Sequence, residues 1–196
     1  MSESLIKECA MLRKALCFTV LVMIISTVGW AEWYKGNTHM HTTLSDGDSS
    51  PDVAVKWYKD HGYRFVVMTD HNKTGDAGMQ AVYGEPGKFL VIVGNEISCS
   101  SEKKPVHLNA INPVDSIAPI NDATIVATLQ KNVSAIRGAG AVPIINHPNF
   151  MWAFGAGEMG QVTGWSLIEI HNCHPAVHNN GGIGKPSTEE MWDALL

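Results

Sequence analysis

Apolar and polar positions follow one another along this chain in a way that predicts a sheet covered by helices. Five apolar runs are continuous and rich in Val and Ile, as expected for strands that are buried on both faces. They predict strands at residues 65–68, 89–93, 106–111, 142–145 and 167–170, and a sixth strand is expected at 37–41.

Three segments between these runs carry helix signals. Ser50 and Pro51 match a helix N-cap and first position, and Gly62 ends that segment. Asp122 is a candidate cap for a second helix, and Ser187 with Glu190 matches a capping box for a third. The expected apolar faces of the first two helices are Ala54, Trp57, Tyr58 and His61, then Ile125, Leu129, Val133 and Ile136, with Gly138 closing the second.

The alternation of strands and helices predicts parallel β/α units, and 196 residues suit one domain. We therefore expect an α/β domain over residues 32–196. The sequence stops at Leu196, about two turns into the third predicted helix. Because a domain rarely ends within an amphipathic helix, we expect this domain to be truncated at its C-terminus.

Residues 1–31 match the parts of a secretory signal peptide. Arg13 and Lys14 precede an apolar run at 15–28, and Gly29 and Ala31 are the small residues of a cleavage site. The run is short compared with the about 20 apolar residues that span a membrane. Export to the periplasm or the cell exterior is therefore favoured over an uncleaved anchor, and no further membrane association is expected.

Composition and charge narrow the function classes. A hydrophobic content of 45% supports a sizeable core, and a net charge of −5 provides no basic surface for a stable nucleic-acid complex. Residues 1–31 carry three basic and two acidic side chains, so the remainder has a net charge of −6. Cys99 and Cys173 remain there and either pair in an oxidising compartment or stay free and buried. The oligomeric state is left open.

Side chains that bind metals recur at the predicted strand ends. His39 and His41 end the first strand, where alternate residues point to the same side. Further candidates follow on later strands and loops: Asp46, Asp70, His71, Glu96, His107 and His147. A single histidine is more often structural. This many at successive strand ends are hard to explain as core packing, because buried charges are costly unless they are paired or metal-bound.

The sequence resembles the PHP (polymerase and histidinol phosphatase) family of metal-dependent phosphoesterases over residues 35–175. The resemblance rests on these motifs: His39-Met-His41-Thr-x-x-Ser45-Asp46-Gly47, Thr69-Asp70-His71-Asn72, Gly94-Asn95-Glu96-Ile97, His107 and Asn146-His147-Pro148. It implies a distorted seven-stranded (β/α)7 barrel that holds two or three Zn, Mn or Fe ions. The Asp-x-His motif that ends the family pattern does not follow His147 here, which agrees with a truncated domain.

The resemblance also implies roles for individual residues. His39 and His41 would bind one ion, Glu96 would bridge it to a second held by His107 and His147, and Asp46 and His71 would hold a third. Asp70 would act from outside the ligand set by orienting a neighbouring imidazole. His171 and His174 are candidates to protonate a leaving group, although an ordinary polar loop explains them equally well.

These features predict an exported hydrolase of phosphate mono- or diesters that acts on a small phosphorylated substrate through a hydroxide held between metal ions. Two alternatives stay open. One is an amidohydrolase-like metal hydrolase, which Glu96 as the bridging carboxylate and the Thr69-Asp70-His71 segment disfavour. The other is a non-catalytic module that binds a metal or ligand.

Overall fold

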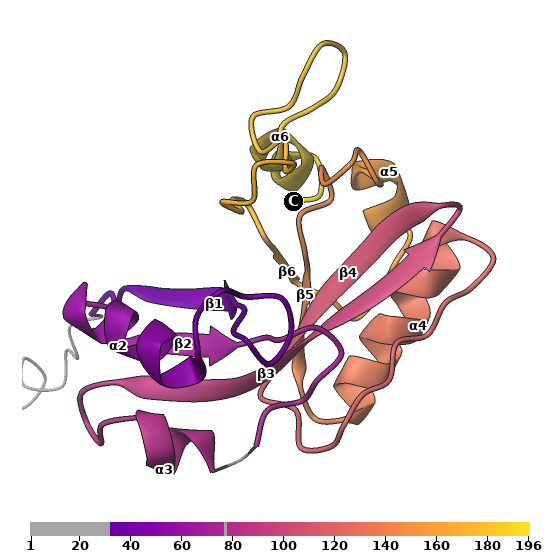
Figure 1. Cartoon of the computed structure of the whole chain (residues 1–196). Coiled ribbons are helices and arrows are strands. Elements are labelled where there is room, and N and C mark those ends of the chain that lie inside the picture. Colours follow the sequence, from indigo (N-terminus) through magenta and orange to yellow (C-terminus); the bar gives the residue numbers. More distant parts are fainter. Residues whose placement is uncertain (1–31, 77) are drawn as a thin grey trace, which may run out of the picture. The chain divides into compact units, whose positions relative to one another are not determined.

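One mixed sheet organises the part of the chain that the structure describes, residues 32–76 and 78–196 (Figure 1). In this computed structural model, Tyr34–Leu196 form one unit. The predicted signal peptide lies outside the described residues. No helix of the described residues is long and apolar enough to cross a membrane.

The six strands lie in the sheet in the same order as in the sequence. All six predicted strands are confirmed. Their bounds are β1 Gly36–Met40, β2 Phe65–Met68, β3 Leu90–Ser101, β4 Lys104–Ile111, β5 Val142–Ile145 and β6 Leu167–Ile168. The main difference is in β3, which continues from the predicted end at Val93 to Ser101.

The expectation of parallel β/α units is correct only at the two sides of the sheet. β1, β2 and β3 are parallel to one another, and so are β5 and β6, but β4 is antiparallel to both β3 and β5. The reason is a two-residue turn at Glu102 and Lys103, whose φ angles are 53° and 63°. Tight hairpin turns need two positive φ angles and usually contain Asn or Gly, so this sequence carries no recognisable hairpin signal.

Helix α2, Pro51–Asp60, packs beside the first strands, and its predicted face is confirmed in part. Ala54 and Tyr58 pack against the core as predicted, but the fully buried residue is Val55, and Trp57 is 50% exposed. The predicted end is confirmed, because His61 is the C-cap and Gly62 follows with a φ of 75°. A short helix, α3 at Met79–Tyr83, precedes β3.

Helix α4, Ile125–Gly138, lies against β3, β4 and β5, and its predicted apolar face is buried as expected. Its cap is Thr124 rather than Asp122, since the Thr124 hydroxyl accepts a hydrogen bond from the Ala127 amide at 3.2 Å. After the four-residue helix α5, Ala156–Met159, the predicted Ser187–Glu190 capping box begins α6 at Thr188–Asp193.

The sheet curls so that strands that are not neighbours approach one another across its inner face. Asn109 on β4 donates a hydrogen bond to the Thr38 carbonyl of β1 at 3.1 Å. Within the described residues the sheet has six strands, and β1 and β6 are not paired. The architecture is thus a mixed α/β fold with a curled sheet, as in part of a barrel. Cys99 is buried and Cys173 exposed, and both thiols are free.

Candidate metal centre

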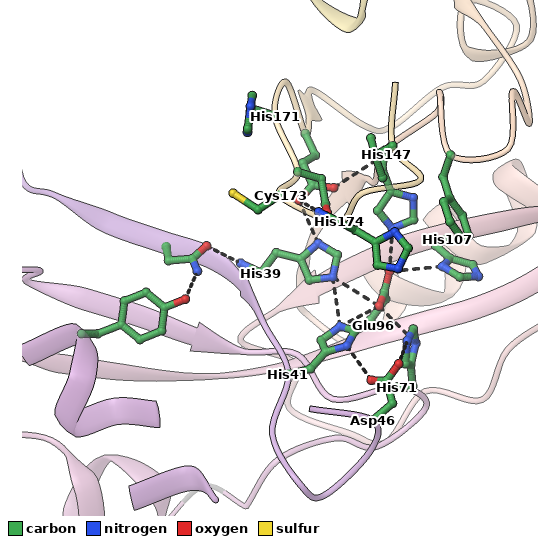
Figure 2. Close-up of a pocket in the computed structure, with 16 residues that line it drawn as sticks. His39, His41, Asp46, His71, Glu96, His107, His147, His171, Cys173 and His174 are labelled. Atoms are coloured by element: carbon green, nitrogen blue, oxygen red, sulfur yellow. Dashed lines mark hydrogen bonds and ion pairs between the residues drawn. The ribbon is translucent and has the colours of Figure 1, made fainter. Parts of the chain in front are cut away.

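All seven predicted metal ligands line one pocket of about 460 Å³ at the inner face of the curled sheet (Figure 2). His39 lies on β1 and His107 on β4, while His41, His71 and His147 lie just beyond the ends of β1, β2 and β5. These histidines surround the carboxylate of Glu96. The seven residues that the sequence pattern singled out therefore lie in one pocket, and their binding of metal stays a prediction.

Glu96 reaches the centre of the pocket because β3 is longer than expected. Residues 90–93 of β3 pair with β2, and residues 94–101 pair with β4. Glu96 therefore lies within the strand, at the level where β2 has ended, and it forms an isolated bridge with His71. The glutamate was predicted to follow the strand; instead the strand itself fixes its backbone.

The Glu96 carboxylate is buried and contacts five imidazole rings. Oε2 lies 2.8 Å from His41 Nε2 and 3.2 Å from His39 Nε2. The remaining contacts are Oε2 to His71 Nδ1 at 3.1 Å, and Oε1 to His147 Nε2 at 3.1 Å and to His107 Nδ1 at 3.3 Å. Both carboxylate oxygens are thus shared among ring nitrogens.

These contacts define two groups that could each hold an ion. His39, Glu96 and His147 form one group, and His41, His71 and Glu96 form the other. The family resemblance placed His39 and His41 on the same ion, and their Nε2 atoms both contact Glu96 Oε2, at 3.2 and 2.8 Å, so which histidines share an ion stays a prediction. Glu96 is the shared carboxylate in both arrangements. The Asp46 carboxylate lies beside the second group, 2.8 Å from His41 Nδ1 and 3.4 Å from His71 Nε2.

The chemistry of this cluster fits divalent cations. Glu96 Oε2 is fully buried. Three ring nitrogens lie within 3.2 Å of it, but none of the described residues donates a well-directed hydrogen bond to it. The Nε2 atoms of His39 and His41 face each other at 3.0 Å. Imidazole nitrogens and carboxylate oxygens are ligand atoms that Zn, Mn and Fe prefer, and this cluster brings both kinds together.

Carboxylates also set the electrostatics of the rings. Burial would raise the pKa of Glu96, but hydrogen bonds from the histidines, first His107 and His147, hold it well below its usual value. Burial would lower the pKa of His39, yet the carboxylates of Glu169 and Glu96 raise it to about 10. The negative potential that these groups create favours a proton or a metal cation at the rings.

Glu169 is the main residue of the site that the sequence interpretation missed. Its Oε1 lies 2.9 Å from His39 Nδ1 and accepts a hydrogen bond from the Asn172 side chain at 3.0 Å. Its Oε2 accepts the backbone N–H of His147 at 3.1 Å. Glu169 directly follows β6, so the rule that found the other candidates, an acidic residue or histidine at each strand end, would have found it too.

Asparagines also hold the central carboxylate. Asn146 donates hydrogen bonds to Glu96 Oε1 at 3.0 Å and to Asn109 Oδ1 at 2.9 Å, and all three side chains are buried. They fix the orientation of Glu96 independently of the histidines.

Asp70 lies beneath the site rather than in the pocket. Its carboxylate accepts hydrogen bonds from the Thr42 amide at 2.8 Å, the Thr42 hydroxyl at 2.9 Å and the Ser45 hydroxyl at 2.7 Å. The resemblance implies that Asp70 orients a neighbouring imidazole, but within the described residues Asp70 has no hydrogen bond to a histidine ring. Asp70 instead holds the loop that carries Asp46.

His171 and His174 line the same pocket and are exposed. Figure 2 shows His171 at the edge of the group, away from Glu96. His174 packs edge-on against Phe150, with ring centroids 5.4 Å apart. Its Nδ1 accepts the Ala176 amide at 3.1 Å, so the proton of the neutral ring is on Nε2.

No family model and no curated protein sequence matches this chain. Among solved structures, a candidate metal-dependent phosphoesterase from Bifidobacterium adolescentis is similar with a TM-score of 0.56 and 13% identity, over 83% of this chain and 84% of that one. This likeness shows a shared fold, as the motif resemblance predicts.

Two further structures are similar over a smaller part of the chain. One is a two-domain protein from Bacteroides vulgatus that contains a predicted PHP-like metal-dependent phosphoesterase, with a TM-score of 0.44 and 24% identity. The match covers 61% of this chain, which spans 36% of that protein. The other is an amidohydrolase from Chromobacterium violaceum with bound sulfate and no metal, with a TM-score of 0.42, 16% identity and coverage of 58% and 66%.

Proposed function

We propose that this chain is a metal-dependent hydrolase of phosphate mono- or diesters. The observation that supports the proposal is the buried Glu96 carboxylate shared by two histidine groups in one pocket. A shared carboxylate holds two cations close together, which suits the in-line displacement of a phosphate ester. The shared fold with a candidate phosphoesterase agrees with this class.

The residues present fit two divalent ions, with Zn, Mn and Fe as the candidates. His39 and His147 would hold one ion and His41 and His71 the other, with Glu96 between them. Asp46 lies beside His41, and His107 lies beside Glu96, so each could add a ligand to one of the two ions. Bound cations would lower the pKa of a water molecule and neutralise charge on the phosphoryl oxygens.

The protein's own groups would orient the ligands and handle the leaving group. Glu169 holds the ring of His39 through Nδ1, which leaves Nε2 facing Glu96. Asp70 fixes the loop that presents Asp46. His174 carries its hydrogen on Nε2 and lines the pocket, so it can donate a hydrogen bond to the oxygen of the leaving group, with His171 as the second candidate.

The experiment is an assay of the full chain with Zn, Mn or Fe on 4-nitrophenyl phosphate and bis(4-nitrophenyl) phosphate. We expect at least one metal to give nitrophenolate release that is lost in Glu96→Gln and retained in Glu189→Gln, an exposed glutamate on α6. Metal binding without release of alcohol or phosphate from either ester would refute the hydrolase and favour a binding module.

We also propose that the protein is exported, on the strength of the basic, apolar and small-residue pattern in residues 1–31. The test is mass spectrometry of the protein expressed in a bacterium and fractionated. A periplasmic product beginning at Glu32 would support export, and a full-length product in the cytoplasm would contradict it.

A further inference from the structure

The pocket has a second end that the metal centre does not use. Besides the residues that hold or orient the ligands, its walls include Asn37, Tyr58 and Cys173. Asn37 lies on β1 two residues before His39, and Tyr58 lies on α2. These side chains are neutral and polar, so they differ in character from the cluster around Glu96.

The hydrogen bonds at this end fix the direction of the Tyr58 hydroxyl group. The backbone N–H of His39 donates to Asn37 Oδ1 at 3.1 Å, which assigns the oxygen of the amide. Asn37 Nδ2 must then be the donor to the Tyr58 hydroxyl. The Tyr58 oxygen therefore accepts this bond, and its own hydrogen has no acceptor among the described residues.

Packing holds Tyr58 in place as a donor. Its ring meets Tyr63 edge-on at 4.8 Å and Trp57 edge-on at 5.2 Å between centroids. Burial raises the pKa of Tyr58 and outweighs the lowering effect of the hydrogen bond from Asn37, so the phenol keeps its proton at neutral pH. A rigid, protonated hydroxyl with a free hydrogen is suited to recognise an oxygen or nitrogen acceptor on a ligand.

Charge limits what can lie at this end of the pocket. Among its described lining residues there is no lysine or arginine, and three are carboxylates, Asp46, Glu96 and Glu169. Cations bound at the histidines would balance one phosphoryl group. A second phosphate or a carboxylate at the far end would have no fixed positive partner, and an unpaired anion in a partly enclosed pocket is unfavourable.

We propose that Asn37 and Tyr58 form a subsite for the alcohol part of the substrate, selecting an uncharged alcohol rich in hydrogen-bond acceptors, such as a sugar. The inference rests on the proposed function, because it assumes that the phosphoryl group lies at the histidine cluster. Tyr58 is then a specificity-determining residue: it acts on the group that leaves and not on the ester bond itself.

The test compares glucose 1-phosphate, butyl phosphate and fructose 1,6-bisphosphate on the Mn-loaded full chain. The wild-type protein should prefer glucose 1-phosphate over both others. Tyr58→Phe should lower kcat/KM for glucose 1-phosphate about fivefold to tenfold, as expected for one lost hydrogen bond, and leave butyl phosphate unchanged. Tyr63→Phe, which changes the neighbouring ring outside the pocket, is the matched control.

Calorimetric binding separates failure of this inference from failure of the proposed function. Glucose 1-phosphate should bind the Mn-loaded protein more tightly than inorganic phosphate does, and Tyr58→Phe should remove that difference without changing the affinity for phosphate. Binding that behaves in this way without turnover would refute the hydrolase but retain the subsite. Equal losses for both esters, no effect of Tyr58→Phe, or a preference for the bisphosphate would overturn the subsite.

Discussion

Replacing Glu169 with Gln tests whether the carboxylate that follows β6 supports the metal centre. Glu169 accepts hydrogen bonds at both oxygens: Oε1 is bonded to His39 and Asn172, and Oε2 to the backbone N–H of His147. A glutamine side chain has one accepting oxygen and cannot accept at both positions. At least one donor in this half-buried site therefore loses its partner, at a cost of about 1–3 kcal/mol.

The substitution also removes the negative charge that orients the His39 ring toward Glu96. Loss of such a partner typically weakens metal binding by about 10- to 100-fold. Zn affinity, measured by competition with a chromophoric chelator, should fall in this range, and urea unfolding of the metal-free protein should show the stability loss. Glu189→Gln is the control for a glutamate outside the site. Unchanged Zn affinity in Glu169→Gln would refute the role assigned to Glu169.

The remaining predictions concern the shared ligand and the local structure around it. Glu96→Gln should abolish binding of both ions, because the carboxylate belongs to both ligand groups, whereas His147→Asn should reduce the number of bound ions from two to one. Metal analysis of the purified proteins measures these numbers, and two tightly bound ions in Glu96→Gln would contradict the prediction. Thr124→Ala removes the side-chain cap of α4 and should lower the free energy of unfolding by about 1 kcal/mol in urea titrations, with no change in metal content. In Gly94→Ala the new Cβ would lie 2.7 Å from Val67 Cγ1, so thermal unfolding should show a loss of about 1–3 kcal/mol; a stability equal to wild type would mean that β3 can shift at no cost.

Sequence alone predicts the strands and the main site residues because both depend on local signals. Continuous apolar runs identify the strands, and polar residues at the strand ends identify His39, His41 and His147. The antiparallel hairpin at Glu102 and Lys103 could not be predicted, because neither residue is typical of a turn with positive φ angles.

The grouping of the ligands is also beyond local sequence rules. Which histidines share an ion depends on the curl of the sheet and on how far β3 extends past β2, and both are set by tertiary packing. Asp70 shows the same limit: its motif marks it as functional, but only the structure shows that its carboxylate bonds to Thr42 and Ser45. A residue type can be read from the sequence, whereas its partner cannot.

The strand order of the sheet, identical to the order in the sequence, has a consequence for how the protein acquires its metal. Each strand pairs with the one synthesised just before it, so the sheet can grow as the chain leaves the ribosome. The pocket forms later than the first strands, because it needs both His39 and Glu169, which are 130 residues apart in the sequence. A nascent chain that has completed β4 already contains His39 and Glu96. It still lacks His147, the third ligand of that group, and Glu169, which orients the His39 ring. We therefore expect the ion held by His39, Glu96 and His147 to be captured last, after the ion at His41, His71 and Glu96, whose three ligands are all in place once β3 has formed.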